Sequence, residues 1–205
     1  DISAGETFDD AAAADGTSSV ASLGLSGLTQ ANSYSLRVRA RCGGAFGTTT
    51  DWSASLDFST LCDDVTSFSE DFDSSSTLPN CYDTVASGTN AFADVLTTGG
   101  ASGTNFVRLR KYLDTEISTL ILPNVSNLGG DYRLTFNVNN LTGADSSVFN
   151  VGTVDDSGVF TSFQEITITT NASWEPMIVD FSTYTGTDNK IAITAGYNAT
   201  SNTNG

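Results

Sequence analysis

Three acidic residues close together in the chain form the clearest group of side chains that could bind a ligand: Glu70, Asp71 and Asp73. Ca2+ takes about six to eight oxygen ligands, from carboxylates and carbonyls. The segment Phe68–Asp73 is expected to be a short strand, in which Asp71 and Asp73 share one face and Glu70 points to the other. At most part of the triplet would then meet one ion. The alternative is an acidic edge strand that resists aggregation.

The composition excludes several other kinds of site. The 205 residues include no His, so a Ser-His-Asp or Cys-His device and any His-ligated metal site are ruled out. Eight Lys and Arg against 24 Asp and Glu give a net charge of −16. This charge argues against a nucleic-acid partner, because such binding depends on basic side chains. It also disfavours an anionic membrane surface, and no apolar run reaches the roughly 18 residues needed for membrane insertion.

Aromatic side chains on the rim of a β-sandwich can stack on sugar rings, although most aromatics in such a fold are needed to fill its core. The residues that could do so are Tyr82, Tyr112, Trp174, Tyr184 and Tyr197. We single out Tyr112 and Trp174 as possible sugar-stacking residues, which makes surface glycans possible partners.

The elements that must position these residues are strands. Runs of four to eight residues with period-two alternation recur between turns rich in Gly, Asn, Asp and Ser, with almost no helical periodicity. We therefore expect an all-β protein. The clearest strand is Tyr34–Arg41, in which Tyr34, Leu36, Val38 and Ala40 would face a core and three arginines would face solvent. Later strands are expected at 56–60, 105–110, 117–122, 132–138, 148–151, 163–168, 174–181 and 190–195.

The first part of the chain resembles a fibronectin type III domain. Leu28 stands six residues before Tyr34, the spacing of a tyrosine corner. With Trp52 and the ending Phe58–Cys62, residues 1–62 are similar to the second half of that sandwich. The early strands of the family and their Trp are missing, so residues 1–62 would be a partial sandwich.

Residues 63–205 resemble the concanavalin-A-type jelly rolls of MAM and cleaved-adhesin domains, which alternate with fibronectin type III modules in large Bacteroidota surface adhesins. The motifs that carry the resemblance are Phe68–Asp73, Leu78–Tyr82, Leu122–Leu128, Tyr132–Phe136, Val151–Asp155, 163–168 and Trp174–Phe181. Such domains end in a strand with an Ile-Asp-Asp-like segment, whereas the present sequence ends at Ser201–Gly205. The jelly roll is therefore expected to lack its closing strand, with a parent chain longer than the sequence given.

The resemblance implies further properties. Relatives hold structural calcium near the first and closing strands, which suggests Glu70 and Asp73 as ligands, with a further Asp from the closing strand. Asp83-Thr-Val85 is similar to Bacteroidota O-glycosylation sites, with Thr84 as the acceptor. The family also implies an extracellular, cell-surface location, export by the type IX secretion route, and proteins connected with gliding motility.

Three cysteines, Cys42, Cys62 and Cys81, fit neither a metal knuckle nor a redox motif. Cys42 and Cys62 end successive strands of one hairpin, so we favour a disulfide between them. The alternative is a disulfide between Cys62 and Cys81. A third alternative is that the cysteines are free, buried thiols. The odd count leaves the fate of the third cysteine undecided.

These observations favour a non-enzymatic module pair of a large secreted bacterial adhesin or filament. Its partners would be neighbouring modules of the same or identical chains. The main alternative is a lectin-like, carbohydrate-binding module. A third hypothesis is that a neighbouring copy supplies the missing strand. Asp114 and Glu116 could serve a glycosidase with Tyr112 as its platform. The Glu-x-Asp-x-x-Glu run of retaining β-glucanases is absent, however, so we expect no enzyme.

Overall fold

The computed structural model describes residues 2–3, 24–40, 49–130, 132–140, 147–168 and 173–196. The chain divides into two compact units, Asp1–Asp63 and Asp64–Gly205, one residue later than the boundary expected from the sequence. Every regular element of the described residues is a strand, and none of these residues is helical. The all-β class expected from the sequence is therefore confirmed.

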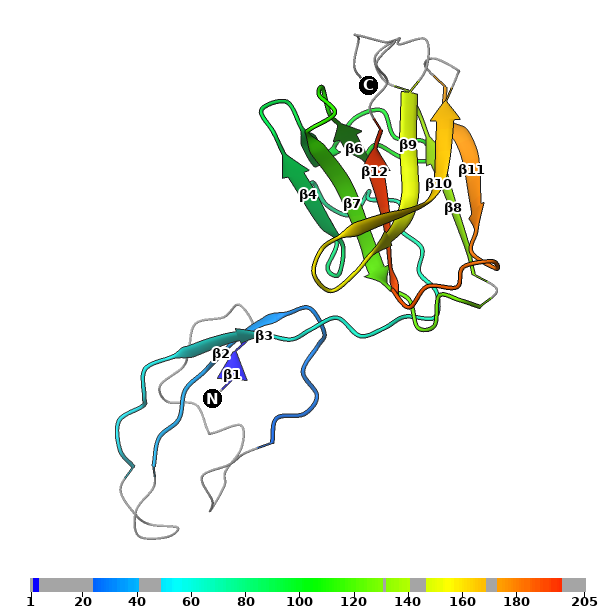
Figure 1. Ribbon diagram of the computed structural model, residues 1–205. Helices are drawn as coiled ribbons and strands as arrows, with labels where there is room; N and C mark the ends of the chain where they lie inside the picture. The colour runs from blue at the N-terminus through cyan, green and yellow to red at the C-terminus, as the bar shows by residue number, and fades with distance from the viewer. Residues whose placement is uncertain are drawn as a thin grey trace. The chain divides into compact units, whose positions relative to one another are not determined.

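The first unit contains a three-stranded antiparallel sheet (Figure 1). Its order is β1 (Ile2–Ser3), β2 (Ser33–Leu36) and β3 (Leu56–Ser59). Tyr34 lies opposite Phe58 across the sheet, with ring centroids 5.8 Å apart. Such cross-strand aromatic pairs stabilise antiparallel sheets, so this pair helps to fix the register of β2 and β3.

The hydroxyl oxygen of Tyr34 accepts the backbone N–H of Thr29 at 2.7 Å. A tyrosine that binds the backbone a few residues upstream is the defining contact of a tyrosine corner. The corner expected from the sequence is therefore present. The wider likeness of residues 1–62 to a fibronectin type III domain stays a prediction.

The strand expected to run from Tyr34 to Arg41 is wrong beyond residue 36, where β2 ends. Val38 was expected in the core but is 58% exposed, whereas Arg37 and Arg39 are half-buried. Their guanidinium carbons lie 4.8 and 4.2 Å from the ring centre of Trp52. Attraction between a guanidinium and an indole face, added to the packing of the arginine stems, explains why the arginines cover this ring instead of facing solvent.

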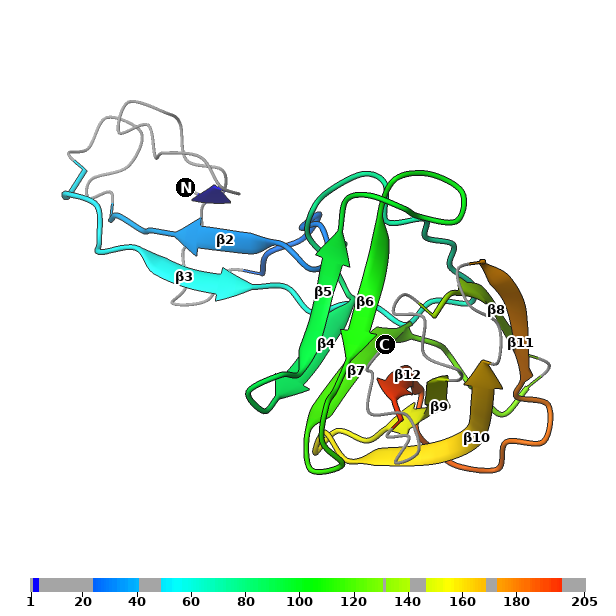
Figure 2. The same cartoon turned by 90° about the horizontal axis from the view of Figure 1, so that it is seen from above.

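The second unit has two layers, which the perpendicular views of Figures 1 and 2 display. One layer is a five-stranded antiparallel sheet of order β10-β9-β12-β7-β4. The other layer consists of two separate pairs, β8 with β11 and β5 with β6. The strands of the first layer are β4 (Asp83–Ser87), β7 (Ile117–Asn124), β9 (Ser147–Val154), β10 (Phe160–Ile168) and β12 (Lys190–Ala195). Those of the second are β5 (Phe92–Leu96), β6 (Phe106–Arg110), β8 (Arg133–Val138) and β11 (Glu175–Asp180).

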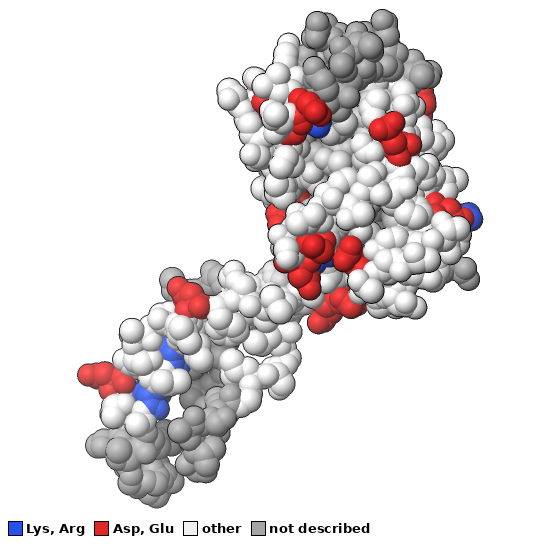
Figure 3. Space-filling view, viewed as in Figure 1, with Lys and Arg blue, Asp and Glu red and all other residues white. Residues whose placement is uncertain are grey.

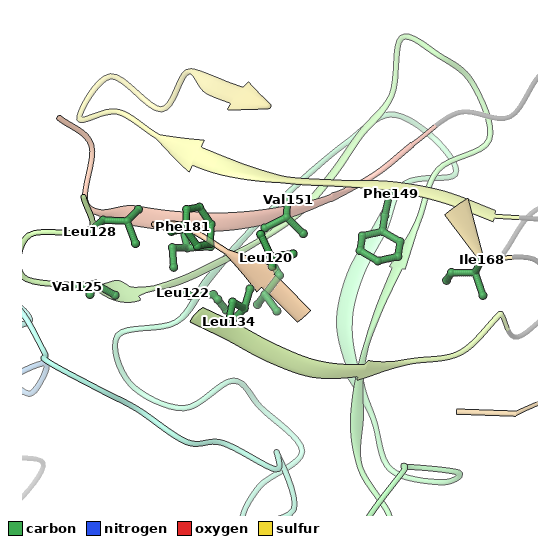
Figure 4. Packing of buried hydrophobic residues seen from close by; sticks show 11 residues of the cluster. Leu120, Leu122, Val125, Leu128, Leu134, Phe149, Val151, Ile168 and Phe181 are labelled. Atoms are coloured by element: carbon green, nitrogen blue, oxygen red, sulfur yellow. The ribbon is translucent and has the colours of Figure 1, made fainter. Parts of the chain in front are cut away.

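The hydrophobic core lies between these layers (Figure 4). Val151 of β9, Val179 of β11 and Phe181 just after it are fully buried. In β8 the alternation expected from the sequence is present, because Leu134 is buried while its neighbours Arg133 and Thr135 are exposed. Period-two burial of this kind places one face of each strand in the core and leaves the other free.

The segment Phe68–Asp73 is not a strand, contrary to the expectation from its sequence. Phe72 has a φ of 62°, in the left-handed region, which an extended strand does not allow. Its N–H is donated to the Oε1 atom of Glu70, and the N–H of Asp73 is donated to Oδ1 of Asp71. Side-chain carboxylates that accept local N–H groups compete with sheet pairing, so the acidic residues themselves favour a loop here.

Candidate binding cavity

The second unit contains a cavity of about 350 Å³ between its two layers. Its walls come from Asn105–Leu109, at and before β6, and from Thr135–Asn140, in and after β8. Apolar side chains of the five-stranded sheet also line it, namely Leu120, Phe149, Ile168 and Ile193. Apolar surface with a small number of polar groups around it is typical of binding sites in proteins.

The acidic loop lies at the cavity, because Glu70, Asp71 and Phe72 are among its lining residues. Asp73 is not, and its carboxylate has a structural role. Its Oδ1 atom accepts the N–H groups of Thr104 and Asn105, each at 2.8 Å. The loop is thereby fastened to the start of β6.

Gly103 allows the close approach of Asp73. A Cβ atom on Gly103 would overlap the Asp73 carboxylate. Asn105 completes the fastening, since its Nδ2 atom donates to the carbonyl oxygens of Phe72 and Ser75, both at 2.9 Å. Sequence reasoning missed Asn105, because an Asn in a chain rich in turn residues carries no signal of a partner some thirty residues away.

Tyr82 lies beneath the acidic loop. Its ring meets those of Phe68 and Phe72 edge-on, with centroids 6.2 and 5.7 Å away. Burial of the hydroxyl and the negative charge of Glu70 together raise the pKa of Tyr82 to about 12. The phenol is therefore neutral throughout the physiological pH range, and its pKa depends on the charge of Glu70.

The carboxylates of the acidic loop are partly engaged in hydrogen bonds. None of the described residues forms a group of three or more Asp, Glu, His or Cys side chains placed to hold a metal ion. Glu70 and Asp71 each use one oxygen to accept an N–H of their own loop, and Asp73 uses one to accept the N–H groups of Thr104 and Asn105. Calcium at Glu70, Asp71 and Asp73 stays a prediction.

The two aromatic residues singled out for sugar stacking occupy different environments. Trp174 lines the cavity, packs edge-on against Phe106 at 5.5 Å and donates its indole N–H to the Gly99 carbonyl at 3.1 Å. Tyr112 is 40% exposed and lies outside the cavity lining, 5.6 Å from the guanidinium of Arg110. Only Trp174 is thus available to a ligand in the cavity.

Asp114 and Glu116, weighed above for a glycosidase, do not face one another across a cleft. Glu116 is buried and accepts the N–H groups of Asn90, Tyr112 and Leu113, at 2.9, 2.6 and 3.0 Å. These hydrogen bonds lower the pKa of Glu116, and the bond from Asn90 has the largest effect. The side chain is therefore an ionised acceptor that shapes the turn before β7, while Asp114 is exposed beside Lys111.

The disulfide expected between Cys42 and Cys62 is wrong. Cys62 is disulfide-bonded to Cys81, the alternative that the sequence left open. Cys42 lies outside the described residues. The favoured pairing assumes regular strands from residue 34 to 60, whereas β2 ends at Leu36 and β3 begins at Leu56.

Thr84, the expected O-glycosylation acceptor, lies in β4 at the end of the five-stranded sheet and is half-buried. Its N–H is donated to the neighbouring Asp83 carboxylate at 2.7 Å. Its modification stays a prediction.

The chain was compared with known proteins. No family model matches it, and no curated protein does. Among solved structures it is similar to the K1 cleaved adhesin domain of Lys-gingipain from Porphyromonas gingivalis W83, with a TM-score of 0.49 and 18% identity. The match covers 62% of this chain and 86% of that one. In the residues that the structure describes, no helix is long and apolar enough to cross a membrane.

Proposed function

We propose that the chain is a non-enzymatic structural and adhesive module pair of a large secreted bacterial surface protein. The observation that carries this proposal is the lining of the cavity. It offers apolar side chains, amides and one indole, and its two carboxylates, Glu70 and Asp71, are sequence neighbours. A glycosidase needs two carboxyls on opposite sides of the scissile bond, and adjacent residues of one loop do not supply that arrangement.

An extracellular location is supported by the disulfide between Cys62 and Cys81, since disulfides persist mainly in oxidising compartments. The acidic surface fits the same setting. In Figure 3 acidic side chains are spread over the visible face of the described residues, with few basic ones among them. A high net charge of one sign keeps neighbouring modules soluble. Type IX export and a part in gliding motility remain proposals based on family resemblance.

The test is to label the complete 205-residue chain with a fluorophore and apply it to arrays of glycans and of extracellular matrix proteins. We expect saturable binding without turnover of the bound material. Antibodies against the chain should also label intact cells of the source organism. Hydrolysis of any array component, or labelling only after the cells are broken, would contradict the proposal.

Carbohydrate binding is a second candidate, favoured by Trp174 in the cavity wall near several amide side chains. Sugars are bound by aromatic faces together with amide and carboxylate hydrogen-bonding groups. A Trp174→Leu variant should then lose glycan binding, whereas Tyr112→Leu, outside the cavity, should keep it. Equal loss in both variants, or in neither, would point to binding elsewhere.

A further inference from the structure

The outer face of the antiparallel pair β5 and β6, which Figure 2 shows side by side, carries both arginines of β6. Val107 and Leu109 of β6 pack against the core. Because successive residues of a strand point to opposite faces, Arg108 and Arg110 point away from the core. Phe92 of β5 lies opposite Arg110, so its ring shares this outer face. A further strand at the free edge of β6 would lie in the same layer and leave the outer face open.

Cations and aromatic rings alternate along this face. The guanidinium carbon of Arg108 lies 4.7 Å from the centre of the Phe92 ring, and that of Arg110 lies 5.5 Å from the same centre. On its other side Arg110 lies 5.6 Å from the ring centre of Tyr112. We call these four side chains the cation–aromatic row. Attraction to a ring face holds a guanidinium in place without using its N–H groups as hydrogen-bond donors.

Arg110 differs from the other basic residues of the second unit. Its guanidinium makes no ion pair and no hydrogen bond within the described part of the chain, although it carries five N–H donors. Of its three nitrogens only Nε is buried, so the two terminal nitrogens reach the surface with their N–H groups unused. The remaining Lys and Arg residues of the unit all form ion pairs: Arg108 with Asp94, Lys111 with Asp114, Arg133 with Asp180 and Lys190 with Asp156.

Neighbouring carboxylates do not occupy Arg110. The N–H of Asn90 is the main cause of the lowered pKa of Glu116, and the charge of Arg110 is the smallest. The Glu116 carboxylate accepts three backbone N–H groups and forms no ion pair with Arg110. Both oxygens of Asp94 accept N–H groups of Arg108, at 2.9 and 2.7 Å. The terminal N–H groups of Arg110 are therefore free to bind an acceptor from outside the chain.

We propose that the cation–aromatic row binds a sugar that carries an oxyanion, such as a uronic acid or a sugar sulfate. The oxyanion accepts N–H groups of Arg110, whose planar fork matches paired oxygens. The sugar ring stacks on Tyr112, which is 40% exposed and has no ring or cation partner among the described residues except Arg110. This inference goes beyond the proposed function and does not depend on the cavity, since neither Phe92, Arg110 nor Tyr112 lines it.

Two features favour a sugar with a single oxyanion. The net charge of −16 opposes a polyanion, whereas exposed charges act over only about 8 Å at physiological salt, so one oxyanion interacts mainly with the groups around Arg110. An aspartate or glutamate of a peptide would also satisfy Arg110. Such a side chain has no ring to cover Tyr112 and Phe92, which is 37% exposed, whereas a sugar brings its ring and its oxyanion together.

The test is NMR titration of the isotope-labelled chain with methyl glucuronide, with a sulfated methyl glucoside and with neutral methyl glucoside. At least one charged sugar should shift the amide signals of residues 110–112 saturably and bind at least about tenfold more tightly than the neutral one, because a hydrogen bond to a charged group is lost in the latter. The two charged sugars distinguish carboxylate from sulfate. No saturable shift with either, or equal affinity for the neutral sugar, overturns the proposal. So does tighter binding of a blocked Gly-Asp-Gly peptide.

A matched pair of arginine variants locates the binding. Arg110→Gln should weaken it by at least about tenfold, whereas Arg133→Gln, which removes an exposed arginine of β8, should leave it unchanged. Because Arg110→Gln could disturb the turn at Glu116, Tyr112→Leu gives a second reading: it keeps the charge and should still weaken binding.

Trp174→Leu separates this site from the cavity. It should leave the affinity for the charged sugars unchanged, because Trp174 lines the cavity and is not part of the row. The two sites thus predict opposite responses to Trp174→Leu and Tyr112→Leu. Loss of charged-sugar binding in Trp174→Leu alone would assign the sugar to the cavity and overturn the proposal. The sugars are titrated directly, so this outcome is separate from the array test of adhesion.

Discussion

Asp73 and Asn105 are joined by reciprocal hydrogen bonds between their chain segments. Oδ1 of Asp73 accepts the N–H of Asn105 at 2.8 Å, and Nδ2 of Asn105 donates to the carbonyl oxygen of Phe72, the residue before Asp73. These two contacts join the acidic loop to the first residue before β6. Of the three residues expected to bind calcium, Glu70 and Asp71 line the cavity, and Asp73 fastens their loop beside it.

Calcium is expected to raise the thermal stability of the chain. A ligand that binds only the folded state stabilises it by about 2.7 kcal/mol at a hundredfold excess over its Kd. Thermal unfolding in millimolar calcium and in excess EGTA measures the difference. Asp71→Asn should abolish it, while Asp63→Asn, outside the acidic loop, should not. Identical melting curves with and without calcium would show that the acidic loop binds no calcium.

Glu70→Gln should lower the pKa of Tyr82. Burial and the charge of Glu70 raise this pKa to about 12, and removing the charge leaves only burial. Because the raised pKa belongs to the folded state, it favours unfolding once the pH exceeds the ordinary tyrosine value of about 10. Ultraviolet titration of the phenolate gives the pKa directly. An unchanged titration in Glu70→Gln would mean that the two side chains do not interact.

Removal of the disulfide should destabilise the chain. Cys62 and Cys81 close a loop of about 20 residues, for which the chain-entropy relation gives about 3 kcal/mol. Cys81→Ser should therefore lower the midpoint of denaturant unfolding, whereas Cys42→Ser should change it little. Peptide mapping under non-reducing conditions identifies the bonded pair. The reverse order of the two variants would restore the pairing of Cys42 with Cys62.

Glu116→Gln is expected to lower the melting temperature at pH 7. The glutamine amide would place N–H groups against the N–H groups of Tyr112 and Leu113, which the carboxylate now accepts. The lowered pKa of Glu116 means that its contribution is complete above about pH 4.3 and is lost as the pH falls through the folded-state value. Melting curves from pH 7 to pH 3 should therefore converge for the two proteins. A constant difference would point to a packing effect alone.

Phe181→Ala should cost about 3–5 kcal/mol of unfolding free energy, the usual range for a fully buried phenylalanine. Phe181 is 0% exposed, and its ring stacks on Phe163 with centroids 4.8 Å apart. Ile178, in the strand β11 that Phe181 directly follows, is 59% exposed, so Ile178→Ala should change stability by less than about 0.5 kcal/mol. Urea denaturation followed by tryptophan fluorescence compares them. Equal costs would show that the core lies elsewhere.

The loop at residues 68–73 could not be predicted from the sequence. Its sequence predicts a strand, yet its carboxylates accept backbone N–H groups of the loop itself and of residues 104–105, some thirty positions away. The strands β4 and β5 were not anticipated either, because Asp83–Ser87 and Phe92–Leu96 are mostly exposed or half-buried and lack a clear alternation. Cross-strand partners, and not local pattern, decide whether such segments pair.

By itself the sequence determined the all-β class and the exclusion of histidine chemistry, because composition and period-two alternation are local properties. The buried face of β8 followed from the same alternation at Leu134, Phe136 and Val138. Only the tertiary structure decided that Cys62 bonds Cys81, that Arg37 and Arg39 cover Trp52, and that Asp73 accepts the N–H groups of Thr104 and Asn105. Each of these depends on residues distant in sequence, whose meeting is set by the packing of whole strands.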